Sequence, residues 1–215
     1  MTQSPNNGNN QDGNNSNENS SNRKQAMIEL SRKTKETEIK VSLNINGNQA
    51  ISINTGIGFL DHMLTQLASH ARWDLTLDVS GDLHIDDHHT VEDIAIVLGS
   101  ALQQSWRNLT TMQRYGQRLL PMDEALILCA VDLSGRGIYV GELPFSRENL
   151  GEISTEMFEH FFNTFATSAA ITLHIKPFYF RNNHHLAEGC FKAVAYALKE
   201  ALSDSQGVNT TKGVL

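Results

Sequence analysis

The sequence predicts an α+β fold made of two similar halves that are related by a pseudo-twofold axis. First, the pattern His-His-x-x-Glu occurs twice, at residues 88–92 and 184–188. Second, an acidic residue followed by histidine precedes each copy, as Asp61-His62 and Glu159-His160, and further identical residue types keep similar offsets. Third, strand-like and helix-like periodicities follow one another in a similar order around both copies. Matches in register indicate the duplication of one layered unit of strands and helices.

The composition excludes several classes of protein. The 215 residues are 40% hydrophobic, which is enough for a substantial core. The net charge of −7 argues against a general nucleic-acid surface, and no apolar run approaches the roughly 18 residues that span a bilayer. Cys129 and Cys190 lie in apolar segments and are expected to be reduced core residues. We therefore expect a cytoplasmic protein with no nucleic-acid and no membrane partner.

The first 25 residues differ from the rest of the chain. Asn, Gly and Ser dominate residues 1–25, which lack apolar periodicity, so we expect a disordered tail. The tail also lacks the features of a secretory signal or a typical transit peptide. The first half is then expected over residues 26–117 and the second over 118–215, with a join near 116–121 and both halves in one compact domain.

Alternating apolar residues predict strands, and apolar residues three and four apart predict helices. In the first half, strands are predicted over 39–45, 50–53, 75–79 and 83–85, and helices over 59–68 and 89–106. In the second half, strands are predicted over 126–130, 138–140 and 171–175, and helices over 158–167 and 186–202. Asn46-Gly47 and residues 134–137 predict turns after which the chain returns as the next strand.

The repeated histidines are expected to bind metal. Helix capping would explain one motif, but not its repetition together with paired upstream histidines. Imidazole and carboxylate groups suit divalent transition metals, and an even division gives three nitrogens and one oxygen to each of two ions. Because residues three apart share a helix face, His89 is expected to join Glu92, and His185 to join Glu188, while His88 and His184 serve other ions. The expected ligands are His62, His88, His89, Glu92, His160, His184, His185 and Glu188.

Long ordered segments of the chain resemble the imidazoleglycerol-phosphate dehydratase family of histidine biosynthesis. The resemblance runs from about residue 32 to residue 215. The segments that carry it are Gly58-Phe59-Leu60-Asp61-His62-Met63-Leu64, residues 81–93 around the first motif, Pro121-Met122-Asp123-Glu124-Ala125-Leu126, Asp132-Leu133-Ser134-Gly135-Arg136, and the second motif with Phe191-Lys192-Ala193.

The resemblance implies a fold, a cofactor and an assembly. The fold has two duplicated βαββα-type halves of the ribosomal protein S5 domain 2-like class, each a four-stranded sheet with two helices. The cofactor is Mn²⁺, two ions per active site, with ligands contributed by neighbouring subunits. The assembly is a homo-oligomer of twenty-four subunits built from trimers. The same eight residues that the repeat selects match the ligands of the family.

The implied reaction is the dehydration of D-erythro-imidazoleglycerol phosphate to imidazole-acetol phosphate, with the substrate imidazolate held at the di-Mn site. Glu36 matches a substrate-binding glutamate of the family, and both Glu36 and Glu188 are candidates for moving a proton. Their ranking stays open at this point. The resemblance places further contacts to the small phosphorylated substrate at Gln66, Arg114, Arg136, Lys192, Thr211 and Lys212, where arginine suits phosphate.

Two segments depart from the family pattern. Phe180 replaces a glycine before the second His-His pair, so that turn is expected to adopt a different backbone. Residues 210–213 read Thr-Thr-Lys-Gly in place of Ser-Thr-Lys-Gly.

A fused enzyme with a separate phosphatase domain is not expected, because the chain leaves no room for one, and two further alternatives to dehydration remain. One is another dinuclear metal-dependent hydrolase acting on a phosphorylated small molecule, but six imidazoles with two glutamates fit a substrate that carries an azole better. The other is a metal-storage shell, against which Arg114, Arg136 and Lys192 argue.

Overall fold

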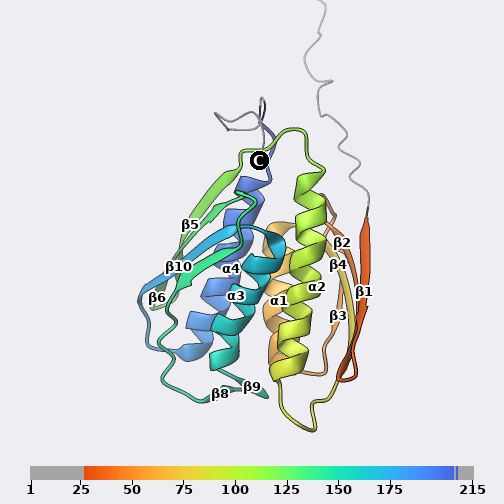
Figure 1. Cartoon of the computed structure of the whole chain (residues 1–215). Helices are drawn as coiled ribbons and strands as arrows, with labels where there is room; N and C mark the ends of the chain where they lie inside the picture. Colours follow the sequence, from red (N-terminus) through yellow and green to blue (C-terminus); the bar gives the residue numbers. More distant parts are fainter. Residues whose placement is uncertain (1–26, 206, 208–215) are drawn as a thin grey trace, which may run out of the picture.

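Two four-stranded sheets form the outer layers of the molecule, and four helices lie between them (Figure 1). The computed structural model describes residues 27–205 and 207, so the predictions for the 1–25 tail and for Thr211 and Lys212 lie outside the described residues. The predicted α+β fold of two duplicated halves, each with one four-stranded sheet and two helices, is confirmed. None of the helices in the described ranges is both long and apolar enough to cross a bilayer.

Each half runs through three strands, a helix, a strand and a helix. The first half contains β1 (Ile28–Lys33), β2 (Thr37–Asn44), β3 (Ile51–Asn54), α1 (Gly58–Ala71), β4 (Asp74–Gly81) and α2 (His88–Arg107). The second contains β5 (Tyr115–Met122), β6 (Ala125–Asp132), β7 (Ile138–Gly141), α3 (Glu156–Ala169), β10 (Thr172–Tyr179) and α4 (Asn183–Ala201), with a small hairpin of β8 (Asn149–Leu150) and β9 (Ile153–Ser154) before α3. The sheet orders β1-β2-β4-β3 and β5-β6-β10-β7 correspond strand by strand.

The strand predicted after the Asn46-Gly47 turn is present as β3, but it does not pair with β2, the strand before the turn. β3 runs parallel to β4, and β7 likewise runs parallel to β10. In the first half the physical reason is the carboxylate of Asp74, which accepts the N–H groups of Asn48 (2.7 Å) and Ala50 (2.9 Å) and so ties the segment before β3 to the start of β4. The predicted strand at Leu83 and Ile85 is wrong, because the N–H of Ile85 closes a turn onto the carbonyl of Asp82 and both side chains are exposed.

Two strands were missed by the periodicity. β1 is an edge strand whose last three residues are exposed, so its alternation is weak. β5 occupies residues 116–121, where the join was expected. It contains Gly116, whose missing side chain leaves room for the backbone of α4 at Ala197, and Pro121, which an edge strand tolerates.

The outer faces of the two sheets differ in character. The outer face of the first sheet is polar along β2 and β4, with residues such as Lys40, Ser42, Thr76 and Asp78. The outer face of the second sheet is largely apolar and carries the exposed side chains of Tyr115, Leu119, Ile138, Val140 and Phe178. Exposed apolar patches of this kind mark surfaces that another protein covers.

The helices of the two halves pack on each other in equivalent pairs. α1 packs on α4 and α2 packs on α3, so the helical layer joins the halves. Gly99 of α2 sits where the helices are closest, because a Cβ there would lie 2.8 Å from both the carbonyl oxygen of Phe165 and the Cβ of Ser168 in α3. Nearby, the indole N–H of buried Trp106 donates to the carbonyl of Ala169 at 2.8 Å.

We expect Gly99→Val to lower the free energy of unfolding by about 1–3 kcal/mol, because the branched side chain would force α2 away from α3. Urea unfolding followed by circular dichroism measures the change. Gln104→Val, at an exposed site of the same helix, is the control for helix propensity. Equal effects from both variants would show that the close approach of the two helices contributes nothing to stability.

Candidate metal centre

The structure brings Asp123, Glu124 and His185 together within the second half, and it forms two clusters of imidazole and carboxylate groups at helix N-termini that each draw on both halves. One contains His62 of α1 with His184 and Glu188 of α4. The other contains His160 of α3 with His88 and Glu92 of α2. Within each cluster the candidate ligand atoms lie within 4.8 Å of one another. The upstream histidine of one half therefore meets the His-His-x-x-Glu motif of the other half.

All four helices begin at the same end of the molecule, which brings these groups together. The ring of Phe59 in α1 lies 5.1 Å from that of His184 in α4 and 6.0 Å from that of Phe158 in α3. The rings of His88 in α2 and His160 in α3 are 4.7 Å apart. Helix N-termini carry partial positive charge, so this end of the molecule favours carboxylates and anionic ligands.

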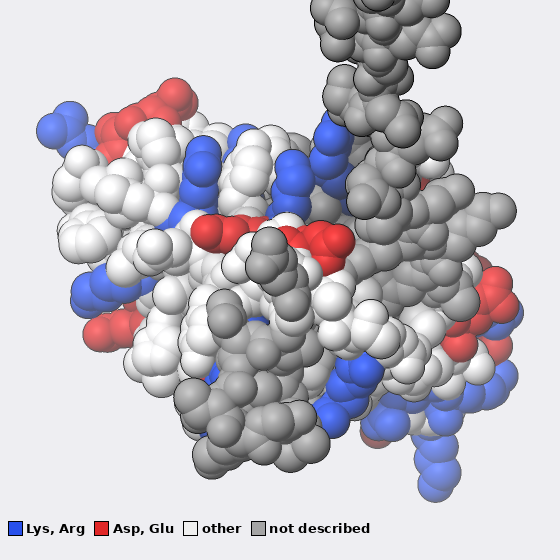
Figure 2. Space-filling view, turned by 90° about the horizontal axis from the view of Figure 1, so that it is seen from above, with Lys and Arg blue, Asp and Glu red and all other residues white. Residues whose placement is uncertain are grey.

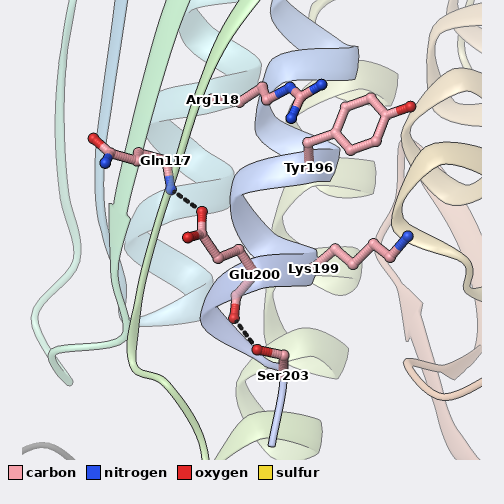
Figure 3. Close-up of a pocket in the computed structure, with 6 residues that line it drawn as sticks. All are labelled: Gln117, Arg118, Tyr196, Lys199, Glu200 and Ser203. Atoms are coloured by element: carbon pink, nitrogen blue, oxygen red, sulfur yellow. Dashed lines mark hydrogen bonds between the residues drawn. The ribbon is translucent and has the colours of Figure 1, made fainter.

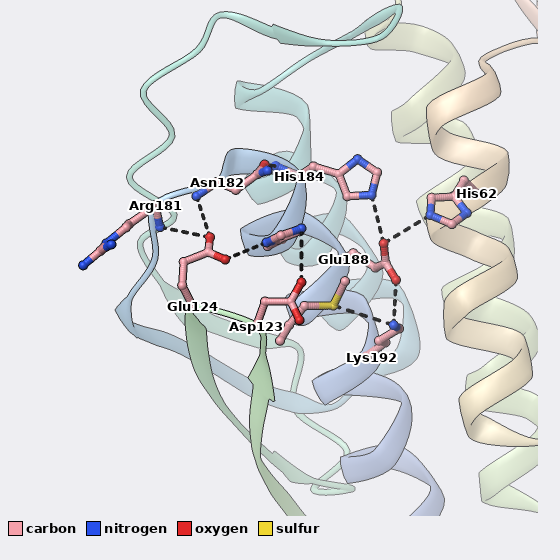
Figure 4. Close-up of polar contacts among 10 residues, drawn as sticks. His62, Asp123, Glu124, Arg181, Asn182, His184, Glu188 and Lys192 are labelled. Atoms are coloured by element: carbon pink, nitrogen blue, oxygen red, sulfur yellow. Dashed lines mark hydrogen bonds and ion pairs between the residues drawn. The ribbon is translucent and has the colours of Figure 1, made fainter.

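Glu188 is the centre of the first cluster (Figure 4). Its Oε2 atom accepts hydrogen bonds from Nε2 of His184 (2.9 Å) and of His62 (3.2 Å), and its Oε1 atom accepts one from Nζ of Lys192 (2.6 Å). Burial opposes ionisation of this carboxyl group, but hydrogen bonds from Lys192, His184 and His62 outweigh it and lower its pKa to about 2. The cluster therefore presents an ionised carboxylate between two imidazoles.

The second cluster has the same composition and is more open. Nε2 of His160 lies 3.2 Å from Oε1 of Glu92, and His88 completes the group. The side chain of Glu92 is 39% exposed, compared with 9% for Glu188. In both clusters two nitrogens and one oxygen converge, and these are donors that divalent transition metals accept.

The structure groups the side chains differently from the expected pairs, which were His89 with Glu92 and His185 with Glu188. In this structure His88 joins Glu92, and His184 joins Glu188, at a spacing of four residues. Residues four apart are neighbours on a helix surface just as residues three apart are, and the position of the third ligand on the adjacent helix selects between the two spacings. The ring of each motif's second histidine stands at 86° to that of the first.

The second histidine of each motif has a carboxylate partner instead. Nδ1 of His89 donates to Oδ2 of Asp82 at 3.0 Å, and Nδ1 of His185 donates to Oε2 of Glu124 at 2.8 Å. The hydrogen bond that His89 donates to Asp82 raises the pKa of His89, and the charge of Glu36 adds to this effect. The hydrogen bond from His185 lowers the pKa of Glu124 to about 2. A carboxylate on Nδ1 leaves Nε2 available as the ligand atom.

Three of the expected substrate contacts lie at the same end of the molecule as the clusters. Lys192 is bonded to Glu188, one helical turn further along α4. Gln66 follows His62 by one turn of α1 and is partly exposed. Glu36 is exposed in the turn between β1 and β2, close enough to His89 for its charge to act on that ring.

Arg114 and Arg136 lie at the opposite end of the same subunit. The N–H of Arg114 donates to the carbonyl of Ala201 at the end of α4, which is roughly 27 Å from its first residue at 1.5 Å per residue. Both guanidinium groups approach Asp132, Arg114 at 2.7 Å and Arg136 at 3.9 Å. The hydrogen bond that Arg114 donates to Asp132 raises the pKa of Arg114. Figure 2 views this end and shows basic side chains around a group of acidic ones.

A separate cavity of ≈ 490 Å³ lies between β5 and α4, and Figure 3 shows the six residues that line it. The guanidinium of Arg118 lies 4.7 Å from the ring centre of Tyr196, whose hydroxyl lies 3.1 Å from Nδ1 of His70. Burial, and then the charge of Lys192, lower the pKa of His70. This polar hollow does not contain the candidate metal ligands, which lie at the open N-terminal end of the helices.

Phe180 does not require a left-handed backbone, because it is absent from the residues of positive φ in the described chain. Its side chain packs against the core. Asn182 keeps the role of helix cap and accepts the N–H of His184 at 2.8 Å. The turn therefore reaches α4 without the glycine of the family pattern.

Sequence reasoning missed Asp82 and Glu124, the carboxylates on His89 and His185. A signal for Glu124 was present, since it directly precedes β6 as Glu36 directly precedes β2. No comparable signal marks Asp82, because its counterpart directly after β10 is Phe180.

Comparisons with known proteins show which family this chain is similar to. The family model of imidazoleglycerol-phosphate dehydratase matches residues 55–198. A protein of that name from Cereibacter sphaeroides is 48% identical over 191 residues, which cover 87% of this chain and 98% of the relative. One from Chlorobium phaeovibrioides is 50% identical over 185 residues, covering 86% and 92%.

Solved structures give the same result. The crystal structure of imidazoleglycerol-phosphate dehydratase from Staphylococcus aureus superposes with a TM-score of 0.77 at 35% identity and covers 84% of this chain and 100% of that one. The enzyme from Pyrococcus furiosus, in complex with (S)-C348, gives a TM-score of 0.76 at 35% identity and covers 86% and 100%.

Proposed function

The chain belongs to the imidazoleglycerol-phosphate dehydratase family, and from this premise we propose the reaction and site in detail. The protein is a lyase of histidine biosynthesis that converts D-erythro-imidazoleglycerol phosphate to imidazole-acetol phosphate and water. It uses two Mn²⁺ ions in each active site, and it acts in the cytoplasm.

The observation that carries this proposal is the pair of cross-half clusters. Each provides two imidazole nitrogens and one carboxylate oxygen, which fits a six-coordinate divalent ion that keeps positions for a substrate. When bound, the two ions would act as Lewis acids toward the imidazole and the hydroxyl group of the substrate. A hydrolase acting on phosphorylated small molecules is less well supported, because neither cluster contains aspartate.

The clusters support active sites that are shared between subunits. An even division of ligands leaves one imidazole to be added to each cluster, and His89 and His185 are the two that remain. Both are held by carboxylates outside the clusters of their own subunit. Arg114 and Arg136 lie a helix length away from His184, so within one subunit they cannot hold the phosphate of a substrate bound there.

Self-association has a suitable surface. The exposed apolar side chains on the outer face of the second sheet contrast with the polar outer face of the first, and a second copy of the chain would cover them. We propose a homo-oligomer of twenty-four subunits built from trimers. In it, Arg114 and Arg136 hold the phosphate of a substrate bound between neighbours, with Lys192, Gln66, Thr211 and Lys212 as further contacts.

Glu36 is the better candidate of the two glutamates for moving the proton. Both oxygens of Glu188 already accept hydrogen bonds from cluster groups, and its pKa of about 2 makes it a poor base near neutral pH. Glu36 is exposed and lies near His89, which leaves its carboxylate available to a substrate bound at this end of the molecule.

Glu92→Gln is expected to lower bound Mn²⁺ and to weaken the assembly, because the amide removes the negative charge of one cluster. Elemental analysis of the purified protein measures the first effect and analytical ultracentrifugation the second. Glu38→Gln, at an exposed site on β2, is the control. A fully metallated oligomer of normal size from Glu92→Gln would exclude Glu92 as a ligand.

The proposed reaction is tested with the intact protein loaded with Mn²⁺. Formation of imidazole-acetol phosphate from the substrate is measured before and after treatment with a chelator, and again after Mn²⁺ is restored. The expected result is activity that is lost with the chelator and regained with the metal. Metal-loaded, assembled protein that forms no product would contradict the proposal.

A further inference from the structure

We propose that Asp82 and Glu124 are positioning residues that hold His89 and His185 with Nε2 facing away from the clusters of their own subunit, so that each imidazole completes a site on a neighbouring subunit. This inference deepens the proposed function and rests on it. It assigns the orientation of both bridging histidines to two carboxylates that lie outside the His62 and His160 clusters.

The contacts define the orientation of each ring. A carboxylate is only an acceptor, so the Nδ1 atoms that meet Asp82 (3.0 Å) and Glu124 (2.8 Å) must carry the proton. Nε2 then keeps its lone pair and serves as the metal-binding nitrogen in the proposed site; within its own subunit, Nε2 of His185 lies 3.7 Å from Oδ2 of Asp123. Carboxylates that fix an imidazole in this way also raise its basicity as a ligand.

The protein places the two carboxylates in different ways, Glu124 through hydrogen bonds to its side chain and Asp82 through the packing of the neighbouring backbone. Oε1 of Glu124 accepts a hydrogen bond from the N–H of Asn182 at 2.8 Å. The side chain that holds His185 is therefore also bonded to the residue that caps α4. Asp82 follows Gly81, where Thr90 of the first turn of α2 packs so closely that a Cβ could not be accommodated. The end of β4 and the start of α2 therefore form one unit that places Asp82 beside His89.

The two halves make this carboxylate–imidazole contact with residues at different positions of the repeat. Glu124 directly precedes β6, and the residue that directly precedes the equivalent strand β2 is Glu36. Asp82 directly follows β4, and the residue that directly follows the equivalent strand β10 is Phe180. Simple duplication would have kept one position in both halves. The same carboxylate–imidazole contact made by non-equivalent residues indicates that the contact itself is required.

This difference between the halves also explains why Glu36, the counterpart of Glu124, is not the residue that holds His89. In the second half the glutamate before the strand is bonded to the histidine, whereas in the first half Asp82 takes that bond. Glu36 is left exposed beside His89, within range of its charge. One half therefore supplies a positioning glutamate, and the other half supplies a glutamate that is free to act on the substrate.

The test measures Mn²⁺ affinity of the full-length protein by competition with a metal indicator. Asp82→Ala and Glu124→Ala should each weaken binding about 10–100-fold, and Asp82→Asn, whose amide oxygen can still accept from Nδ1, should weaken it less. Asp78→Ala, at an exposed carboxylate on the outer face of β4, should bind as the unmodified protein does. Thermal unfolding without metal checks that the variants are folded.

A double-mutant cycle separates positioning from general stability. If Asp82 acts through His89, adding Asp82→Ala to His89→Ala should cause no further loss of affinity, and likewise for Glu124→Ala added to His185→Ala. Additive losses, or unchanged affinity in the folded single variants, would overturn this inference while leaving the proposed function intact. Unmodified protein that binds no Mn²⁺ would overturn both.

Discussion

Glu36→Gln is expected to lower kcat about 10²–10⁴-fold while Mn²⁺ content and oligomer size stay unchanged. The amide preserves the shape of the side chain but cannot accept the substrate proton. Glu36 makes no contact with either cluster within the described residues, and its side chain is exposed, so neither metal binding nor folding should respond.

Steady-state kinetics with Mn²⁺-loaded protein measure this effect. Glu29→Gln, which changes an exposed glutamate on the neighbouring strand β1, is the matched control and should leave kcat within about twofold of the unmodified protein. Substantial activity in Glu36→Gln would move the proton transfer to another group, with Glu188 the next candidate.

Two inactive variants, His89→Ala and Glu188→Gln, are expected to restore activity when they are co-assembled. In the proposed site, one subunit supplies His62, His184 and Glu188, and a neighbouring subunit supplies His89. Such a site is intact when the first subunit carries His89→Ala and the neighbour carries Glu188→Gln, because each variant then lies outside that site. Random mixing makes about a quarter of the subunit pairings intact, which sets the scale of the recovery.

The measurement uses co-expressed subunits with two different tags, purified through both. His184→Ala mixed with Glu188→Gln is the control, because these two residues lie in one cluster and every subunit then carries a broken cluster. Recovery in the control, or none in the His89→Ala mixture, would show that the ligands are not exchanged between subunits in this way.

The helices could be predicted from the sequence because each buries one apolar face that recurs every three to four residues. The structure extends them by a few residues at the ends, as α1 and α3 show. The strands were harder. β1 and β5 are edge strands with exposed residues on both faces. The direction of β3 depends on hydrogen bonds that Asp74, which is distant in sequence, accepts from the segment before β3.

Like the fold, the site could be predicted from the sequence only in part. The eight candidate ligands follow from the repeat, because duplication places them in matched positions. Their grouping does not, since a spacing of three or four residues serves equally on an isolated helix and the packing of α1 on α4 and of α2 on α3 decides between them. The distance between Arg114 and the clusters likewise emerges only when the length and direction of α4 are known.

Crystals of the Mn²⁺-loaded assembly, measured at the manganese absorption edge, test the shared dinuclear site most directly. Anomalous difference maps should show two peaks per subunit. One should lie on His62, His184 and Glu188, the other on His88, Glu92 and His160, and each should be completed by His89 or His185 of a neighbouring subunit. Peaks coordinated by His89 and Glu92 of the same subunit, or no peaks at either cluster, would contradict the account.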